Sequence, residues 1–137
     1  MLAKAESLQR IARLQVELQT RGIDAALIVY PIDIYYFAGT RQNALLYVPS
    51  TGQPVLLVRK SLARARLEAV LEDIRPFPSS KDFPALIGAG VKKVGLTFDV
   101  VPMQQYGFYQ KLFAGCEFVD ISALNRELRS LKSPWEL

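Results

Sequence analysis

The sequence predicts an α/β fold in which a mixed β-sheet is flanked by helices on both faces. Segments with helical periodicity alternate along the chain with short runs of aliphatic and β-branched residues. The first such run, residues 25–30, is apolar without alternation, which is typical of a strand buried on both faces. Residues 44–48 and 55–58 are β-rich, and the prolines, glycine and small polar residues between them favour a hairpin. This antiparallel pair makes the predicted sheet mixed.

The first part of the chain is expected to place a helix on either side of the first strand. A helix over residues 4–21 ends at Gly22, because glycine is favoured just past a helix C-terminus. Pro31 ends the first strand, and residues 32–38 form a short helix that Gly39 stops. The buried face of the first helix is predicted from apolar residues at helical spacing, namely Leu8, Ile11, Leu14 or Gln15, and Leu18.

The remaining segments continue the alternation of helices and strands. Pro76 and Pro78 cannot donate backbone hydrogen bonds, so a strand that contains them belongs at a sheet edge. Pro102 fits the start of a helix, whose inner face is predicted to hold Met103, Tyr106, Tyr109 or Gln110, and Phe113. In order, we expect a helix over 61–71, the edge strand over 74–78, a short helix over 82–89, a strand over 93–98, the helix after Pro102, a strand over 117–121 and a helix over 122–131.

Length and composition describe one globular domain. The chain has 137 residues, of which 50% are hydrophobic and 22% are charged, enough for a single core. No apolar run approaches the roughly 20 residues of a membrane-spanning helix, and the N-terminus lacks the apolar block of a signal peptide. The single cysteine, Cys116, excludes an internal disulfide framework and is expected to pack as a small apolar group. We therefore expect a cytoplasmic protein.

A local group of basic residues accompanies the net charge of +4. Its members are Arg59, Lys60, Arg64 and Arg66, and acidic residues follow on the same segment. No aromatic residues alternate with these cations, as a platform for single-stranded nucleic acid would require. The pattern favours a solvated helix face over a phosphate-binding patch.

The residue types needed for most catalytic sites are absent. The chain has no histidine, which excludes Ser-His-Asp and Cys-His systems and makes a zinc site untenable with one cysteine. It has neither a Walker lysine loop nor a dinucleotide-type glycine triplet. Metal chemistry with carboxylates alone is an alternative that would use Asp24, Asp33 or Asp99. Asp33 and Asp99, however, fit better as caps of the turns that they begin, Asp33 also as a partner of its helix dipole.

The last five residues, 133–137, have the pattern of a helix start with no helix after it. Ser133 fits an N-cap, Pro134 the first helical position, and Glu136 the third residue of a capping box. This pattern indicates a domain boundary, so we expect residues 1–132 to form one domain and residues 133–137 to begin another.

Three stretches of the chain together resemble the N-terminal domain of the creatinase/prolidase/aminopeptidase P family of metallopeptidases. Residues 21–29 read RGIDAALIV, similar to the helix end and first strand of that family. Residues 31–40 read PIDIYYFAGT, similar to its Tyr-x-x-Gly-like turn. Residues 128–137 read LRSLKSPWEL, similar to the joint that precedes the catalytic domain. The order of the elements between these stretches also matches.

The resemblance implies a ribonuclease H-like arrangement of layers and a division of labour within a longer protein. Residues 133–137 would start the linker or first helix of a catalytic domain. In the family, that second domain holds two divalent metal ions, and a metal-activated water releases a residue next to proline. The fragment would then hold no cofactor and catalyse no reaction, while its parent would be a metal-dependent Xaa-Pro peptidase.

The resemblance also implies what the domain contacts. In dimeric members, the N-terminal domain of one subunit often reaches over the active site of the other, through the segment that here is Arg41, Gln42 and Asn43. Arg41 would pair with a substrate carboxylate or with the partner subunit, the alternative being a solvent-exposed loop arginine. Of Tyr35 and Tyr36, one is expected in the core and the other partly exposed, with Tyr36 a candidate subunit contact. The expected partners are the catalytic domains of the same chain and of a second subunit in a homodimer, without nucleic acid or membrane.

Two other functions remain open at this point. A creatinase-type hydrolase that acts on a small C–N compound would have the same domain layout. A ribonuclease H-like nuclease would need several carboxylates converging on a divalent metal, and Asp24 begins a strand that has no predicted carboxylate partner. If the parent protein dimerises through this domain, the isolated chain should expose an apolar face and self-associate weakly.

Overall fold

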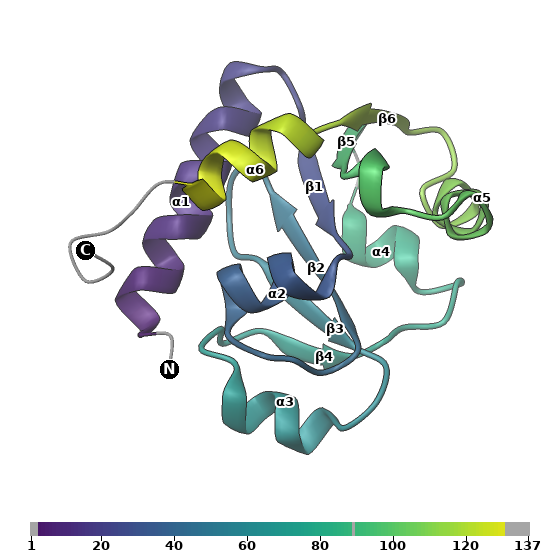
Figure 1. Ribbon diagram of the computed structural model, residues 1–137. Coiled ribbons are helices and arrows are strands. Elements are labelled where there is room, and N and C mark those ends of the chain that lie inside the picture. The colour runs from purple at the N-terminus through teal and green to yellow at the C-terminus, as the bar shows by residue number, and fades with distance from the viewer. Residues whose placement is uncertain (1–2, 89, 131–137) are drawn as a thin grey trace.

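The computed structural model, which describes residues 3–88 and 90–130, contains a six-stranded mixed sheet with helices on both faces (Figure 1). The predicted α/β class with a mixed sheet is therefore confirmed. The expected helix start at residues 133–137 lies outside the described residues. Among the residues described, no helix is both long enough and apolar enough to cross a bilayer.

The strands lie side by side in the order β4-β3-β2-β1-β5-β6. β2 runs antiparallel to both of its neighbours, and every other neighbouring pair is parallel. The proline-containing strand β4 lies at a sheet edge, as its missing donors require. The bounds are β1 (Ala25–Ile28), β2 (Ala44–Pro49), β3 (Val55–Val58), β4 (Ile74–Pro76), β5 (Lys93–Leu96) and β6 (Glu117–Asp120).

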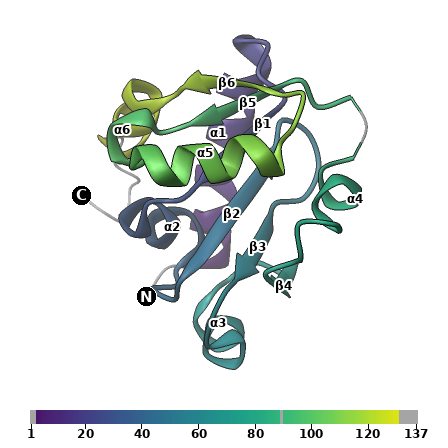
Figure 2. The same cartoon turned by 90° about the vertical axis from the view of Figure 1, so that its right-hand side faces the viewer.

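The helices divide between the two faces of the sheet. One face carries α1 (Lys4–Thr20), α2 (Pro31–Ala38), α3 (Leu62–Glu68) and α6 (Ser122–Ser130), whose buried residues share one apolar cluster. The other face carries α4 (Phe83–Ile87) and α5 (Met103–Leu112), which belong to a second cluster. Figure 2 looks onto the face that α5 crosses, with α1 behind the sheet. A single 3-10 turn, η1 (Phe98–Val100), links β5 to α5.

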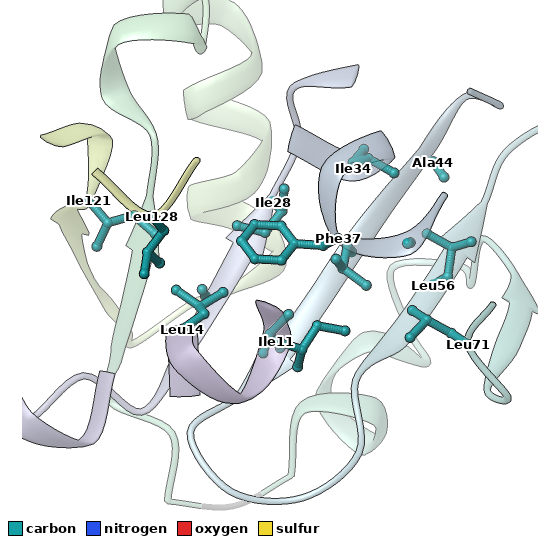
Figure 3. Packing of buried hydrophobic residues seen from close by; sticks show 14 of the residues in the cluster. Ile11, Leu14, Ile28, Ile34, Phe37, Ala44, Leu56, Leu71, Ile121 and Leu128 are labelled. Carbon is teal, nitrogen blue, oxygen red and sulfur yellow. The ribbon is translucent and has the colours of Figure 1, made fainter. Parts of the chain in front are cut away.

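β1 is buried on both faces, as its unbroken apolar sequence predicts. Ala26 and Ile28 belong to the cluster that contains Phe37 of α2, and Ala25 and Leu27 belong to the cluster on the other face. Figure 3 shows the ring of Phe37 among side chains of α1 and β1. Because alternate residues of a strand point to opposite faces, this short strand joins two cores into one domain.

Glycine ends the first two helices where the sequence predicts. Gly22 and Gly39 have φ angles of +69° and +81°, which glycine adopts without a steric cost. The N–H of Gly39 donates to the carbonyl oxygen of Tyr35 at 3.0 Å and closes the last turn of α2. The chain can therefore leave α2 sharply and enter β2.

Several predicted bounds and faces are wrong, and tertiary contacts explain them. The helix expected over 61–71 ends at Glu68, because the N–H of Val70 donates to the carbonyl oxygen of Ala38 at 3.1 Å. Leu8 is 49% exposed, since the buried stripe of α1 runs through Ser7 instead. Met103 is 88% exposed on the first turn of α5. The strands expected over 25–30, 74–78, 93–98 and 117–121 end at Ile28, Pro76, Leu96 and Asp120.

A first prediction concerns Gly95 of β5. A Cβ atom added there would lie 2.9 Å from Cγ2 and 3.0 Å from Cδ1 of Ile121, whose side chain is 1% exposed and packed in the core. We expect Gly95→Ala to lower the free energy of unfolding by about 1–3 kcal/mol, the usual cost of an overpacked core. Urea denaturation followed by circular dichroism measures this change.

Gly107→Ala, in α5, is the matched control for that substitution. No atom lies within 4 Å of a Cβ added at Gly107, and the residue is helical. Alanine has the higher helix propensity, so this variant should gain up to about 1 kcal/mol. If both variants lost stability equally, Ile121 would not pack against β5 as described.

Candidate functional site

The connection between α2 and β2 is tied down at both sides. The N–H of Gln42 donates to Oγ1 of the buried Thr40 at 3.2 Å, and the Gln42 side-chain amide donates to Oε1 of Glu68 at 2.8 Å. At the other side, the N–H of Arg59 donates to the carbonyl oxygen of Asn43 at 2.9 Å. Gln42 therefore anchors the loop to α3, and Asn43 anchors it to the end of β3.

Arg41 projects from this anchored loop and is exposed. Its guanidinium carbon lies 4.8 Å from the centroid of the Tyr35 ring, a cation–π contact. No Asp or Glu among the described residues lies within 4 Å of its guanidinium nitrogens. The loop thus presents a guanidinium on an aromatic ring, with its N–H groups available to an outside acceptor.

Tyr36 contacts α1 and α6, whereas the loop over residues 40–43 is held by α3 and by the residue after β3. Its hydroxyl donates to the carbonyl oxygen of Leu128 in α6 at 3.0 Å, and the guanidinium of Arg10 lies 4.1 Å from its ring centroid. Tyr36 is half-buried against the apolar cluster of α1, α2, α3 and α6, and Tyr35 is 39% exposed, so neither tyrosine lies in the core, contrary to the prediction for one of them. The four predicted contact residues therefore do not form one cluster. Arg41 contacts Tyr35, and Gln42 contacts α3. Asn43 contacts the residue after β3, and Tyr36 contacts α6.

A cavity of about 580 Å³ opens beside Asn43. It lies at the carboxyl ends of β1 and β3, where β1 leads to α2 on one face and β5 leads to α5 on the other. Open α/β sheets bind ligands where such connections diverge. The lining residues are Val29, Tyr30, Pro31, Asn43, Ala44, Leu45, Arg59, Val100, Pro102, Gln104, Gln105, Phe108 and Tyr109.

The basic residues that were predicted to form a solvated face include one, Arg59, that also lines the cavity. Arg59, Lys60, Arg64 and Arg66 are all exposed, as expected. Arg59, however, also lines the cavity, and its guanidinium carbon lies 4.3 Å from the ring centroid of Phe77. Sequence reasoning missed this role. The sequence pattern that could have indicated it is the position of Arg59 directly after a strand. This position places Arg59 at the same end of the sheet as Tyr30, which follows β1.

Asp33 is buried and forms an ion pair with a half-buried arginine. It lies in the first turn of α2 as predicted, but its side chain makes no capping hydrogen bond, so the cap assignment is wrong. Its Oδ1 lies 3.2 Å from Nη1 of Arg129 in α6. Burial raises the pKa of this carboxyl, and the Arg129 charge and the Asn125 side chain act in the opposite direction. The pair joins α2 to α6.

The other two candidate aspartates also have structural partners. Oδ2 of Asp24 accepts hydrogen bonds from the N–H groups of Lys92 and Lys93 at 2.8 and 2.9 Å, which lower the pKa of Asp24. Asp99 pairs with Arg126 and does not cap its own turn, contrary to prediction. Among residues 3–88 and 90–130, no group of three or more His, Cys, Asp or Glu side chains could hold a metal ion.

Cys116 packs as predicted for a small apolar residue. It contacts the apolar cluster of the α5 face, and its thiol donates to the carbonyl oxygen of Val91 at 3.3 Å. Burial raises the pKa of this thiol, which lowers the share of the reactive thiolate.

One family model matches most of the chain. The model of the family described as "Creatinase/Prolidase N-terminal domain" matches residues 10–131. No curated protein sequence matches the chain.

Solved structures match the fold at low sequence identity. A proline dipeptidase from Streptococcus pneumoniae TIGR4 has a TM-score of 0.78 at 18% identity, over 89% of this chain and 98% of that one. An Xaa-Pro aminopeptidase from Streptococcus pyogenes has a TM-score of 0.79 at 18% identity, over 93% of this chain and 100% of that one. Dipeptidase PepE from Mycobacterium ulcerans has a TM-score of 0.79 at 19% identity, over 98% of this chain but 39% of that one. At these identities the likeness shows the fold.

A second prediction follows from the ionisation of Asp33. The pKa of Asp33 is raised above its ordinary value of 3.8 in the folded state, so the native protein binds the proton of this carboxyl more tightly than the unfolded chain does. The contribution of Asp33 to stability is therefore fully present below pH 3.8, and it is lost as the pH rises through the pKa of the folded state. Urea denaturation from about pH 4 to about pH 7 should therefore show the wild type losing stability relative to Asp33→Asn.

Asp24→Asn supplies a control of opposite sign. The lowered pKa of Asp24 means that its contribution is present above the ordinary value of 3.8 and is lost as the pH falls through the native pKa. The wild type should therefore lose stability relative to Asp24→Asn on acidification. A constant free-energy difference between wild type and Asp33→Asn across the range would contradict the buried position of Asp33.

Proposed function

The chain belongs to the creatinase/prolidase N-terminal domain family, and we propose that it is the non-catalytic N-terminal domain of a proline-directed metallopeptidase. The parent would be an Xaa-Pro aminopeptidase or dipeptidase, and this domain would contribute to subunit association and substrate access. The observation that carries the proposal is the family match over residues 10–131, supported by proline peptidases among the similar structures.

Catalysis is proposed to reside in a separate domain that follows residues 1–132 and to which residues 133–137 would lead. Two divalent metal ions would be bound there, because the described residues of this chain offer no matching set of carboxylate and histidine ligands. No catalytic step is therefore assigned to residues of this domain. A cytoplasmic location is proposed from the single cysteine and the absence of disulfide chemistry.

The outer face of α2 is the proposed contact with a second subunit. Ile32 is 56% exposed and Tyr35 is 39% exposed, and their spacing of three residues places them on one side of the helix. Arg41 lies over the Tyr35 ring and extends this surface. Exposed aromatic and arginine side chains beside an aliphatic one are the composition enriched in protein interfaces.

Arg41 is the residue through which this surface would affect the reaction. Its guanidinium suits a bidentate contact with a carboxylate of the substrate or of the partner subunit. The hydrogen bonds of Gln42 and Asn43 would hold the loop that carries it. Tyr36 would act behind the surface, since it fixes α2 to α6 through Leu128.

A third prediction compares the 137-residue chain with the complete product of its gene. With Mn²⁺ present, the complete product should hydrolyse an Xaa-Pro dipeptide, and the chain alone should not, because no metal ligands converge among its described residues. In the complete product, Arg41→Ala should raise KM more than it lowers kcat. Arg64→Ala, another exposed arginine, is the control and should change neither.

The other outcomes of these assays identify other functions. Hydrolysis of creatine but not of the dipeptide would assign the parent to the creatinase-type hydrolases. Metal-dependent cleavage of nucleic acid by the chain alone, lost in Asp24→Ala, would indicate a nuclease. Either result, or a gene that encodes no further domain, would contradict the proposal.

A fourth prediction tests the contact surface. At about millimolar concentration, which favours complexes with weak association free energy, the isolated chain should show a monomer–dimer equilibrium by sedimentation velocity. Ile32→Gln should shift this equilibrium toward the monomer, because it removes the most exposed apolar side chain of α2. Leu67→Gln, on α3, should leave it unchanged. A strictly monomeric profile of the wild type at this concentration would refute the contact.

A further inference from the structure

The cavity at the carboxyl ends of β1 and β3 has the size of a small-molecule site. Its volume of about 580 Å³ lies within the roughly 300–1,000 Å³ typical of ligand pockets. Apolar groups such as Val29 and Phe108 share the lining with the side-chain amides of Asn43 and Gln104. Such a mixture suits a ligand with one polar end and an apolar body.

The charge of the cavity comes from Arg59. Among the described residues that line it, Arg59 is the only charged side chain, and none is aspartate or glutamate. No carboxylate in residues 3–88 and 90–130 lies within 4 Å of this guanidinium. The lining therefore carries a positive charge that no described residue neutralises.

Aromatic rings hold the Arg59 guanidinium in place. Its central carbon lies 4.3 Å from the ring centroid of Phe77 and 5.8 Å from that of Phe108. The five N–H donors of a guanidinium lie in its plane, so stacking on a ring leaves their edge available. Two parallel donors on that edge match the two oxygens of a carboxylate.

Tyr109 lines the same cavity as Arg59 and contributes a neutral hydroxyl. The residue is 3% exposed and lines the cavity, and none of the described residues accepts or donates a hydrogen bond to its hydroxyl. Burial raises the pKa of Tyr109 while the Arg59 charge acts against that shift, so the hydroxyl keeps its proton at neutral pH. The hydroxyl oxygen is not among the buried polar atoms without a partner in the described residues, so it is accessible from the cavity and can donate to a ligand there.

We propose that this cavity binds a small molecule that carries a carboxylate on an apolar body. Arg59 receives the carboxylate in a bidentate contact, Tyr109 and the amides of Asn43 and Gln104 donate further hydrogen bonds, and the body packs on Phe108. A carboxylate fits better than a phosphate group, because a single guanidinium with no second cation balances one negative charge. This binding requires the 137-residue chain alone and does not rest on the proposed peptidase function.

The test is a titration of the ¹⁵N-labelled chain followed by NMR. N-Acetyl-leucine supplies a carboxylate on an aliphatic body, and N-acetyl-leucinamide is its neutral counterpart. We expect saturable shifts of the Arg59 Nε–H and the Asn43 and Gln104 side-chain amides with the acid, and at least about tenfold weaker binding of the amide, the usual scale of a charge-assisted contact. Equal affinities, or no saturable shift, would overturn the proposal.

Variants assign the binding to Arg59. Arg59→Gln should weaken binding of the acid at least about tenfold, and Arg59→Lys, which keeps the charge but not the fork, should fall between it and the wild type. Arg64→Gln is the matched control, an exposed arginine outside the cavity, and should bind like the wild type. Equal affinity of Arg59→Gln and Arg64→Gln, or tighter binding of inorganic phosphate than of the acid, would contradict the assignment. If Arg59→Gln fails to fold, the comparison of acid and amide on the wild type decides.

Discussion

The structure depends on the burial of β1 on both faces of the sheet. This strand pairs antiparallel with β2 and parallel with β5, so it joins the reversed strand β2 to the parallel pair β5 and β6. All four of its side chains are buried, two in each apolar cluster. Because burial of apolar surface is the dominant favourable term in folding, both layers of helices depend on this strand. Its small residues, Ala25 and Ala26, leave room for larger side chains such as Phe37 on α2 and Phe113 beyond α5.

The same strand determines where the cavity and the proposed contact surface lie. β1 leads to α2 on one face and β5 leads to α5 on the other, and the cavity opens between their diverging connections. On the first face, the Asp33–Arg129 ion pair and the Tyr36–Leu128 hydrogen bond hold α2 against α6. These two polar contacts join helices that lie far apart in the chain, and they add to the apolar packing between them. The exposed side of α2 and the Arg41 loop are thereby presented on a rigid support.

Much of the fold could be predicted from the sequence, and the errors occur where distant residues decide. Helical spacing and glycines placed α1 and α2, and two prolines placed β4 at an edge. The end of α3 depends on a hydrogen bond between Val70 and Ala38, which no local pattern contains. Asp33 resembles a cap in sequence because its partner, Arg129, is distant in the chain. The cavity combines Arg59 with residues of α5, and only the topology of the sheet brings them together.

Under the proposed function, the domain would act by contact, and the Arg41 loop would border the active site of a neighbouring subunit. The most direct test is a crystal structure of the complete gene product bound to a proline-containing dipeptide. We expect a dimer in which residues 39–43 of one subunit border the metal site of the other, with the Arg41 guanidinium in hydrogen-bonding contact with a carboxylate of the dipeptide or of the partner. A structure in which this loop faces solvent, away from every active site, would contradict it.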